Sequence, residues 1–304
     1  MNAITTVKLE KRYGSRFALK AVDLEIPQGS IYGLLGPNGA GKTTALETIA
    51  GLRNPTSGEV LVANESGYAA YCPDVAEFEP WLSPIEVLDL SAGLLGHKKS
   101  RKEIMDVLTM VGLDSGADRR VRSFSRGMFA RLSLGAALVC DPEILLLDEP
   151  VAALDPLGQH QIMDLLEDMR GSKTVVISSH DLTEIEQRCD TVGVLNEGAL
   201  IYQGRISDLL SSHARHIWRM EVHSRSEEIV TMLKAAEWTS TVSELAPGII
   251  EIFYHDSERA ETELPRVLAN GGARLVSLTQ VKPNLEQIFL SLTGGQSANE
   301  PRRD

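Results

Sequence analysis

The sequence predicts an α/β fold with an inserted helical subdomain, followed by a small α+β domain of the ferredoxin-like kind. Continuous apolar runs at 144–147 and 174–178 are typical of buried parallel strands, and helical patterns alternate with them. Between about 76 and 135 the pattern is helical, which indicates the inserted subdomain. After residue 212, strands and helices follow in a β-α-β-β-α-β order, which is typical of a split βαβ domain.

These changes of pattern give the expected domain limits. Residues 1–212 form the α/β domain, with its helical subdomain at about 76–135, and residues 213–293 form the second domain. The polar segment 294–304 is expected to be a disordered tail. With 304 residues, the chain is long enough for two domains that each have their own hydrophobic core.

Alternating or continuous apolar segments predict the strands of the first domain. They lie at 7–9, 21–26, 29–35, 58–62, 144–147 and 174–178. An apolar stripe at 44–50 predicts a helix directly after the third of these strands. Ser83 followed by Pro84 provides an N-cap and a proline at the first helical position, so a helix of the subdomain is expected to start there.

The second domain is expected to contain four strands and three helices. The strands lie at 216–222, 239–245, 248–254 and 273–279, and the helices at 226–238, 256–270 and 284–292. In the closing helix, Leu285, Ile288 and Phe289 share one face. This face packs on its own domain in the simpler interpretation, and helps to dimerise or regulate the protein in the alternative.

A glycine-rich segment joins the strand at 29–35 to the helix at 44–50. It reads Gly36-Pro37-Asn38-Gly39-Ala40-Gly41-Lys42-Thr43-Thr44, and G-x-x-x-x-G-K-T between a strand and a helix is typical of a phosphate-binding P-loop. Glycines let backbone N–H groups turn toward an anion, and the helix N-terminus adds partial positive charge. Lys42 is expected to reach the β- and γ-phosphates, and the Thr43 hydroxyl to bind Mg²⁺. The segment predicts binding of a nucleoside triphosphate, because an ordinary glycine-rich turn does not require the lysine, the threonine and both flanking elements.

Two carboxylates follow the apolar run at 144–147. Ligands of open α/β sheets bind at the carboxyl ends of the strands, which is where Asp148 and Glu149 are expected to lie. Asp148 is expected to hold Mg²⁺ through water, and Glu149 to polarise the attacking water as a general base. The alternative, a strand that ends in a solvated acidic turn, is disfavoured beside a P-loop. His180 ends another buried strand, and this position favours a contact with the γ-phosphate over a structural role.

Composition excludes several classes of protein. A formal net charge of −12 and a pI near 5.1 argue against nucleic-acid binding, which depends on phosphate neutralisation. The sequence has no apolar run of the roughly 18 to 20 residues that span a bilayer and no signal-peptide core, so a cytosolic protein is expected. Its three cysteines are isolated in sequence, which favours reduced structural thiols. His213 and His216 have loose metal-ligand spacing, but an exposed linker is the simpler interpretation.

Taken together, the motifs resemble those of an ABC ATPase over roughly residues 4–210. The Walker A segment at 36–43, the Walker B strand with its glutamate at 144–149, Ala153-Leu154-Asp155 and His180 occur in the order and spacing of that family. Phe124-Ser125-Arg126-Gly127-Met128 lies in the place of the family's signature loop. Because five separate motifs agree, the resemblance is specific.

The resemblance implies further roles. Tyr13 matches the aromatic residue that stacks on adenine. Ser125 and Gly127 match the signature groups that contact the γ-phosphate bound to the opposite subunit, and Asp155 matches a loop that crosses the dimer interface. ATP and Mg²⁺ would thus lie between two such domains, and hydrolysis would separate them.

Two positions depart from the family pattern. Arg126 stands where the signature has its first glycine, which requires an ordinary backbone conformation there. Asp74 stands where the family has a Mg²⁺-contacting glutamine; it still supplies an oxygen ligand, but a shorter and charged one.

The C-terminal extension and the segment Pro283-Asn284-Leu285-Glu286-Gln287-Ile288-Phe289-Leu290 resemble the ATPase subunits of bacterial drug, antibiotic, sodium and lipid exporters. That branch implies a cytosolic subunit that acts as a dimer, with itself or with a paralogous ATPase, on separate transmembrane permease subunits. The segment at about 75–95 would face the permease, which would hold the protein at the inner face of the cell membrane. Two alternatives stay open: an ATP-binding regulatory subunit with weak hydrolysis, and a non-transport ABC protein.

Overall fold

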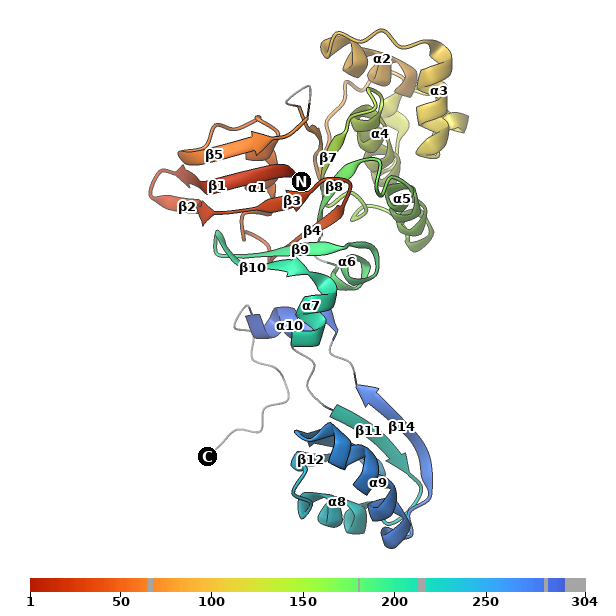
Figure 1. The fold of residues 1–304 in the computed structure, drawn as a ribbon. Helices are drawn as coiled ribbons and strands as arrows, with labels where there is room; N and C mark the ends of the chain where they lie inside the picture. Colours follow the sequence, from red (N-terminus) through yellow and green to blue (C-terminus); the bar gives the residue numbers. More distant parts are fainter. Residues whose placement is uncertain (65–67, 180, 213–216, 282–283, 293–304) are drawn as a thin grey trace. The chain divides into compact units, whose positions relative to one another are not determined.

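The computed structural model describes residues 1–304 except 65–67, 180, 213–216, 282–283 and 293–304 (Figure 1). The chain divides into two compact units, and the division falls between Ser207 and Asp208, close to the change of pattern expected at 212. The expected tail and the histidines at 213 and 216 lie outside the described residues. No helix in the described ranges is long and apolar enough to cross a membrane.

A six-stranded sheet forms the centre of the first unit, with the strand order β10-β9-β4-β8-β7-β6. Its strands are β4 (Ile31–Leu35), β6 (Ala70–Cys72), β7 (Ile144–Asp148), β8 (Thr174–Ser179), β9 (Thr191–Asn196) and β10 (Ala199–Arg205). Neighbouring strands are parallel except for the hairpin of β9 and β10. Every residue of β4, β7 and β8 is buried, which is the reason that their sequences are continuous apolar runs.

An antiparallel sheet packs beside it, with β1 (Asn2–Tyr13) paired to β2 (Arg16–Val22), β3 (Glu25–Pro27) and β5 (Ser57–Val62). The prediction of a single strand at 21–26 is wrong, because β2 ends at Val22 and β3 begins only at Glu25. The Thr6 hydroxyl donates to Val22 O and accepts from Leu24 N, each at 2.8 Å. These two side-chain hydrogen bonds take the place of backbone pairing between Val22 and Glu25. As a result, β2 and β3 pair with different parts of β1.

Seven helices are described in the first unit and at its boundary. They are α1 (Lys42–Ile49), α2 (Pro84–Leu94), α3 (Arg101–Met110), α4 (Arg126–Leu138), α5 (Pro156–Asp168), α6 (Leu182–Arg188) and α7 (Ile206–Ser212). Short 3₁₀ turns lie at Asp114–Gly116 and Val121–Ser123. The Ser83 side chain caps α2 in a capping box with Glu86, so the expected start of this helix is confirmed.

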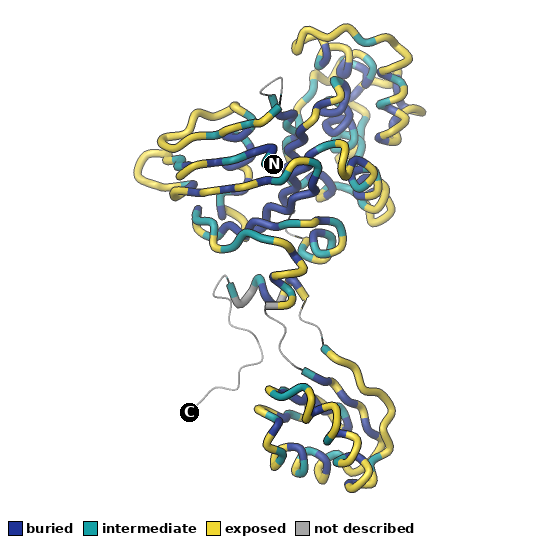
Figure 2. Tube along the Cα trace, in the orientation of Figure 1, coloured by how far each residue is buried: buried dark blue, intermediate teal, exposed yellow. Residues whose placement is uncertain are grey.

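The core of this unit lies where α1 and the antiparallel strands cover the parallel sheet. Buried residues of β1, α1, β7 and β8 meet there, including Ile4, Leu46, Leu146 and Val176. Figure 2 shows the buried chain concentrated along these central elements. This packing holds α1, and therefore the loop before it, against the ends of β4 and β7.

The second unit contains β11 (Ile217–Val222), α8 (Ser226–Lys234), β12 (Thr239–Ala246), β13 (Ile249–Tyr254), α9 (Ser257–Gly271), β14 (Leu275–Val281) and α10 (Leu285–Leu292). Its sheet is antiparallel throughout, in the order β12-β13-β11-β14. The element order is the β-α-β-β-α-β of a split βαβ domain. Trp218, Trp238 and Tyr254 form its aromatic centre, with ring centroids 4.6 to 6.4 Å apart for the two pairs that Trp218 makes.

Candidate active site

The loop between β4 and α1 curves around the side chain of Lys42. Lys42 is buried, and its Nζ donates to Gly36 O at 2.7 Å across the loop. Gly41 has φ 110°, and a Cβ at this position would lie 2.5 Å from Ala18 O. The second glycine of the P-loop pattern is therefore required by backbone conformation and by close packing on β2.

The turn between β9 and β10 is hydrogen-bonded to this loop through the backbone. Gly198 N donates to Ala40 O at 3.0 Å, and Lys20 N donates to Gly198 O at 2.7 Å. The loop is thus tied through backbone hydrogen bonds to two sheets at once. The first N–H groups of an α-helix have no intrahelical partner, so the start of α1 is suited to bind an anion at the mouth of the loop.

Asp148 ends β7 and is almost completely buried. Its Oδ1 accepts a hydrogen bond of 2.5 Å from Ser178 Oγ on β8, and its Oδ2 lies 3.4 Å from the hydroxyl of Tyr71 on β6. Burial, followed by the Asp148 carboxylate, raises the pKa of Tyr71, so this tyrosine keeps its proton and donates. The sequence did not identify Ser178 or Tyr71 as site residues. The register of β6, β7 and β8 identifies them, because it places both beside Asp148.

Glu149 follows directly and has an uncommon backbone conformation for its residue type, with φ 49°. Its N–H donates to Ser178 Oγ at 3.0 Å and to Ser178 O at 3.2 Å. Its Oε1 lies 3.8 Å from Lys42 Nζ, and both side chains are at least 85% buried. The P-loop cation and this carboxylate therefore face one another across a narrow space.

A cavity of about 430 Å³ opens in front of these groups. Its lining includes Tyr13, Arg16, Ala18, Pro37, Asn38, Gly39, Ala40, Gly41, Lys42, Thr43, Thr44, Asp74, Asp148 and Glu149. The structure thus brings together the expected aromatic residue, the P-loop and the acidic residues from four separate segments. Arg16 was not expected there. Its side chain has no hydrogen-bond or ion-pair partner among the described residues, and it also lines a neighbouring cavity of about 460 Å³.

Tyr13 lies at the rim of the cavity and is 44% exposed. Lys11 Nζ lies 5.3 Å from the centre of its ring, and the Arg53 guanidinium lies 5.8 Å away. An exposed ring flanked by cations offers a flat surface beside an anion site.

Four of the expected residues that the structure describes do not line this cavity. They are Gly36, whose carbonyl oxygen accepts from Lys42, and Ser125, Gly127 and Asp155. Ser125 caps α4 by accepting from Met128 N at 3.3 Å, and Asp155 caps α5 by accepting from Gly158 N at 3.0 Å. Gly127 packs against the loop before α5, where an added Cβ would lie 3.2 Å from the Leu154 side chain. Arg126 is the first residue of α4 and has an ordinary backbone conformation, as expected. His180 lies outside the described residues.

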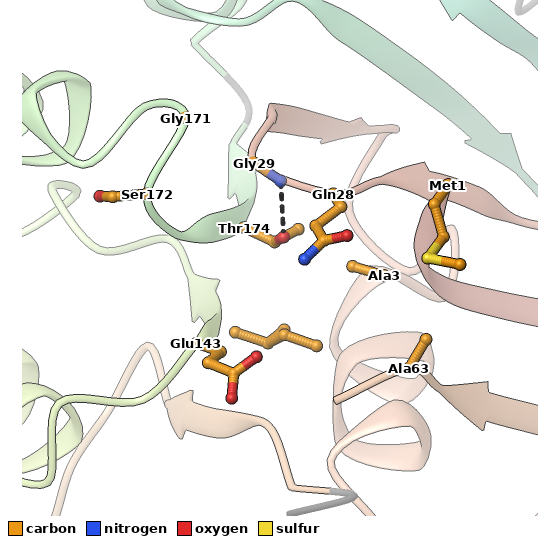
Figure 3. Close-up of a pocket in the computed structure, with 10 residues that line it drawn as sticks. Met1, Ala3, Gln28, Gly29, Ala63, Glu143, Gly171, Ser172 and Thr174 are labelled. Atoms are coloured by element: carbon orange, nitrogen blue, oxygen red, sulfur yellow. Dashed lines mark hydrogen bonds between the residues drawn. The ribbon is translucent and has the colours of Figure 1, made fainter. Parts of the chain in front are cut away.

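Another cavity, of about 330 Å³, lies at the amino ends of the parallel strands (Figure 3). Gln28, Glu143 and Thr174 are among its lining residues, and Gly29 N donates to Thr174 Oγ1 at 3.0 Å. Ligands of open α/β sheets bind at the opposite, carboxyl ends. We therefore take the cavity at the P-loop as the candidate site.

Comparison with known proteins places these features in a family. Residues 19–152 match the family description "ABC transporter". The chain is 33% identical to the bacitracin transport ATP-binding protein BcrA of Enterococcus faecalis, over 96% of both chains. It is 32% identical to the linearmycin resistance ATP-binding protein LnrL of Bacillus subtilis, over 94% of this chain and 96% of the relative. It is 31% identical to the Nod factor export ATP-binding protein I of Cupriavidus metallidurans, over 97% and 98%.

Solved structures are similar in fold to the larger part of this chain. A bacterial ABC transporter cassette solved as a dimer is similar with a TM-score of 0.62 and 26% identity, over 67% of this chain and 98% of the cassette. A dimeric cassette in a post-hydrolysis state, bound to ADP and Pi, is similar with a TM-score of 0.62 and 25% identity over the same shares.

Proposed function

The chain belongs to the ABC transporter ATP-binding proteins and is an ATP hydrolase of this class, and we propose that it powers an exporter through separate membrane subunits. One observation carries the proposal. The P-loop lysine, two consecutive carboxylates and an exposed aromatic ring converge on one cavity at the carboxyl ends of the parallel strands.

The residues at this cavity fit ATP and Mg²⁺. The loop at 36–44 offers backbone N–H groups and Lys42 to phosphates, and the ring of Tyr13 offers a stacking surface to adenine. Thr43, Asp74 and Asp148 present hard oxygen donors to the same space, which suits Mg²⁺. When bound, this ion neutralises charge on the β- and γ-phosphates.

Each side chain then has one task. Lys42, fixed by Gly36 O, stabilises the charge of the γ-phosphate. Asp148, held by Ser178, keeps an oxygen directed to the metal site. Glu149 accepts the proton of the attacking water. We assign the orientation of that water to His180, which matches the family's histidine in sequence.

The site is completed by a second ATPase domain in this proposal. Ser125, Gly127 and Asp155 do not line the cavity of their own chain, although they match motifs that contact nucleotide in the family. A second copy would present them to the bound triphosphate, and a paralogous ATPase would do so in a heterodimer. The similarity to cassettes solved as dimers supports this arrangement.

Export is the direction that the relatives support, since their names describe bacitracin transport, linearmycin resistance and Nod factor export. We propose that the protein works in the cytoplasm at the inner face of the membrane, where permease subunits carry the cargo. The net charge of −12 supports a protein partner over a nucleic acid.

The test is ATP hydrolysis by purified protein as a function of its concentration, with Glu149→Gln in parallel. A rate that rises faster than linearly, together with an ATP-dependent dimer of the Glu149→Gln variant in size-exclusion chromatography, is the expected result. ATP binding with negligible turnover, unchanged by reconstitution with the membrane subunits, would contradict the proposal and support a regulatory subunit.

A further inference from the structure

We propose that Ser178 is a positioning residue whose single hydroxyl sets the geometry of both carboxylates, Asp148 and Glu149. The inference rests on the proposed function, since it assigns a role within the same site. Ser178 is a buried residue at the end of β8 and does not line the cavity. Its effect on hydrolysis is therefore expected to pass entirely through its two neighbours.

The register of the strands brings Ser178 to this position. β7 and β8 are parallel, with Ile144 opposite Thr174 and Asp148 opposite Ser178. Partner residues on parallel strands point to the same face of a sheet, so the side chains of Asp148 and Ser178 are neighbours. Tyr71 pairs with Leu146, two residues before Asp148, and its hydroxyl therefore reaches the same carboxylate from the other side.

The hydroxyl of Ser178 is fully engaged as a bridge. A serine hydroxyl has one O–H to donate and lone pairs to accept. The donor goes to Asp148 Oδ1 at 2.5 Å, and the acceptor takes the N–H of Glu149 at 3.0 Å. One atom thus links the carboxylate proposed to serve the metal with the backbone of the residue proposed to serve the water.

The backbone of Glu149 needs such support. Its φ of 49° is uncommon for a residue with a side chain, and such conformations persist where the surroundings determine them. Ser178 holds the N–H through both its hydroxyl and its carbonyl oxygen, and Ala152 N donates to Glu149 O at 3.2 Å from the other side. Loss of the Ser178 hydroxyl removes one of these restraints and also frees Asp148 Oδ1.

The experiment compares Ser178→Ala with Thr174→Val in the full-length protein. Thr174 lies four residues earlier on the same strand, is buried, and its hydroxyl accepts one hydrogen bond, from Gly29 N, at the far end of the sheet (Figure 3). Ser178→Cys replaces the hydroxyl by a larger and weaker donor, and Ser178→Thr keeps the hydroxyl. The readouts are kcat, KM for ATP, the Kd for Mn²⁺ of the ADP complex from electron paramagnetic resonance, the Kd for metal-free fluorescent ATP, and Tm.

We expect Ser178→Ala to lower kcat and to weaken Mn²⁺ binding by about 10- to 100-fold, as loss of an outer-shell partner does elsewhere. KM and the affinity for metal-free nucleotide should change by less than about 3-fold, since the P-loop is intact. Ser178→Cys should follow Ser178→Ala in kcat, and Ser178→Thr should recover most of the lost kcat. Thr174→Val should leave kcat and Mn²⁺ binding unchanged.

The proposal is overturned if Ser178→Ala and Ser178→Cys keep wild-type kcat and Mn²⁺ affinity, or if they change only Tm. An equal loss in Thr174→Val would also overturn it, because the effect would then belong to the stability of β8. Failure of the proposed function has a different signature, since the wild-type protein itself would then show negligible turnover, while the Mn²⁺ affinities of the variants would still test the role of Ser178.

Discussion

The two units of this protein bury different kinds of residue. In the first unit, Lys42, Asp148 and Ser178 are buried polar groups near the carboxyl ends of the parallel strands. Ser178 donates to Asp148, and Lys42 donates to Gly36 O. In the second unit, the interior is formed by residues such as Trp238 and Ile252, and the buried carboxylate Glu251 accepts from Arg219 at 2.9 Å.

The two units therefore differ in how their buried residues affect the free energy of unfolding. Buried polar groups and a left-handed Glu149 reduce stability, and a protein keeps them where they perform chemistry. The interior of the second unit is formed mainly by apolar and aromatic side chains, whose burial contributes to stability. The comparison predicts that substitutions in the first unit change turnover and those in the second change unfolding.

Lys42→Ala is expected to have the largest effect on turnover. It removes the cation that faces the γ-phosphate position and leaves Gly36 O without its donor, so kcat should fall about 100- to 1000-fold. Phosphate release and fluorescent-nucleotide binding measure the effect. Lys20→Ala is the matched control, because Lys20 is exposed and lines only the neighbouring cavity. A Lys42→Ala variant with turnover within about 3-fold of wild type would break the comparison.

Trp238→Ala is the counterpart in the second unit. Trp238 is completely buried, and its removal leaves a large void, so the free energy of unfolding of that unit should fall by about 3 to 5 kcal/mol. Urea unfolding followed by circular dichroism measures the loss. ATP hydrolysis below the transition should stay at the wild-type rate. A parallel loss of hydrolysis in native buffer would show that the two units are coupled.

Trp238→Phe sharpens this result. The indole Nε1 is buried without a hydrogen-bond partner among the described residues, and phenylalanine removes that unpaired donor. The expected cost is therefore smaller than the change of volume alone predicts, about 1 to 2 kcal/mol by the same measurement. A cost equal to that of Trp238→Ala would mean that the indole has a partner in solution.

Gly41→Ala should weaken nucleotide binding without loss of the fold. The added Cβ meets Ala18 O at 2.5 Å in a conformation that alanine rarely adopts, so the loop must shift. We expect fluorescent ATP to bind about 10-fold more weakly, which corresponds to about 1.4 kcal/mol. Gly51→Ala is the control, since Gly51 also has a positive φ, 74°, but lies in open space after α1. Equal losses in both variants would assign the effect to backbone strain in general.

The smallest effect concerns pH. Burial raises the pKa of the Cys72 thiol from 9.0 to about 11. The folded state thus keeps this proton between those pH values while the unfolded state loses it. The contribution to stability is complete below pH 9 and is lost as the pH rises toward 11, by about 1 kcal/mol per pH unit. Urea unfolding of wild type and Cys72→Ala between pH 8 and 10.5 measures it, and parallel curves for the two proteins would contradict this assignment.

Much of the candidate site was predictable because its signals are local. The P-loop pattern between a strand and a helix, and the apolar run that ends in Asp148 and Glu149, each occupy a few consecutive residues. Both were found where the sequence placed them, and both line one cavity. The strand expected at 21–26 failed for the opposite reason, since the hydroxyl of Thr6, far earlier in the chain, determines the break after Val22.

The sequence by itself determined the fold class, the P-loop and the identity of the two carboxylates, because periodicity and turn chemistry act over short segments. Only the tertiary structure decided which residues meet across strands. Ser178 lies 30 residues from Asp148 and Tyr71 lies 77 residues from it, and the parallel register of β6, β7 and β8 brings all three together. Such contacts depend on strand order and register, which are set by the packing of the whole sheet, so no local pattern in the sequence encodes them.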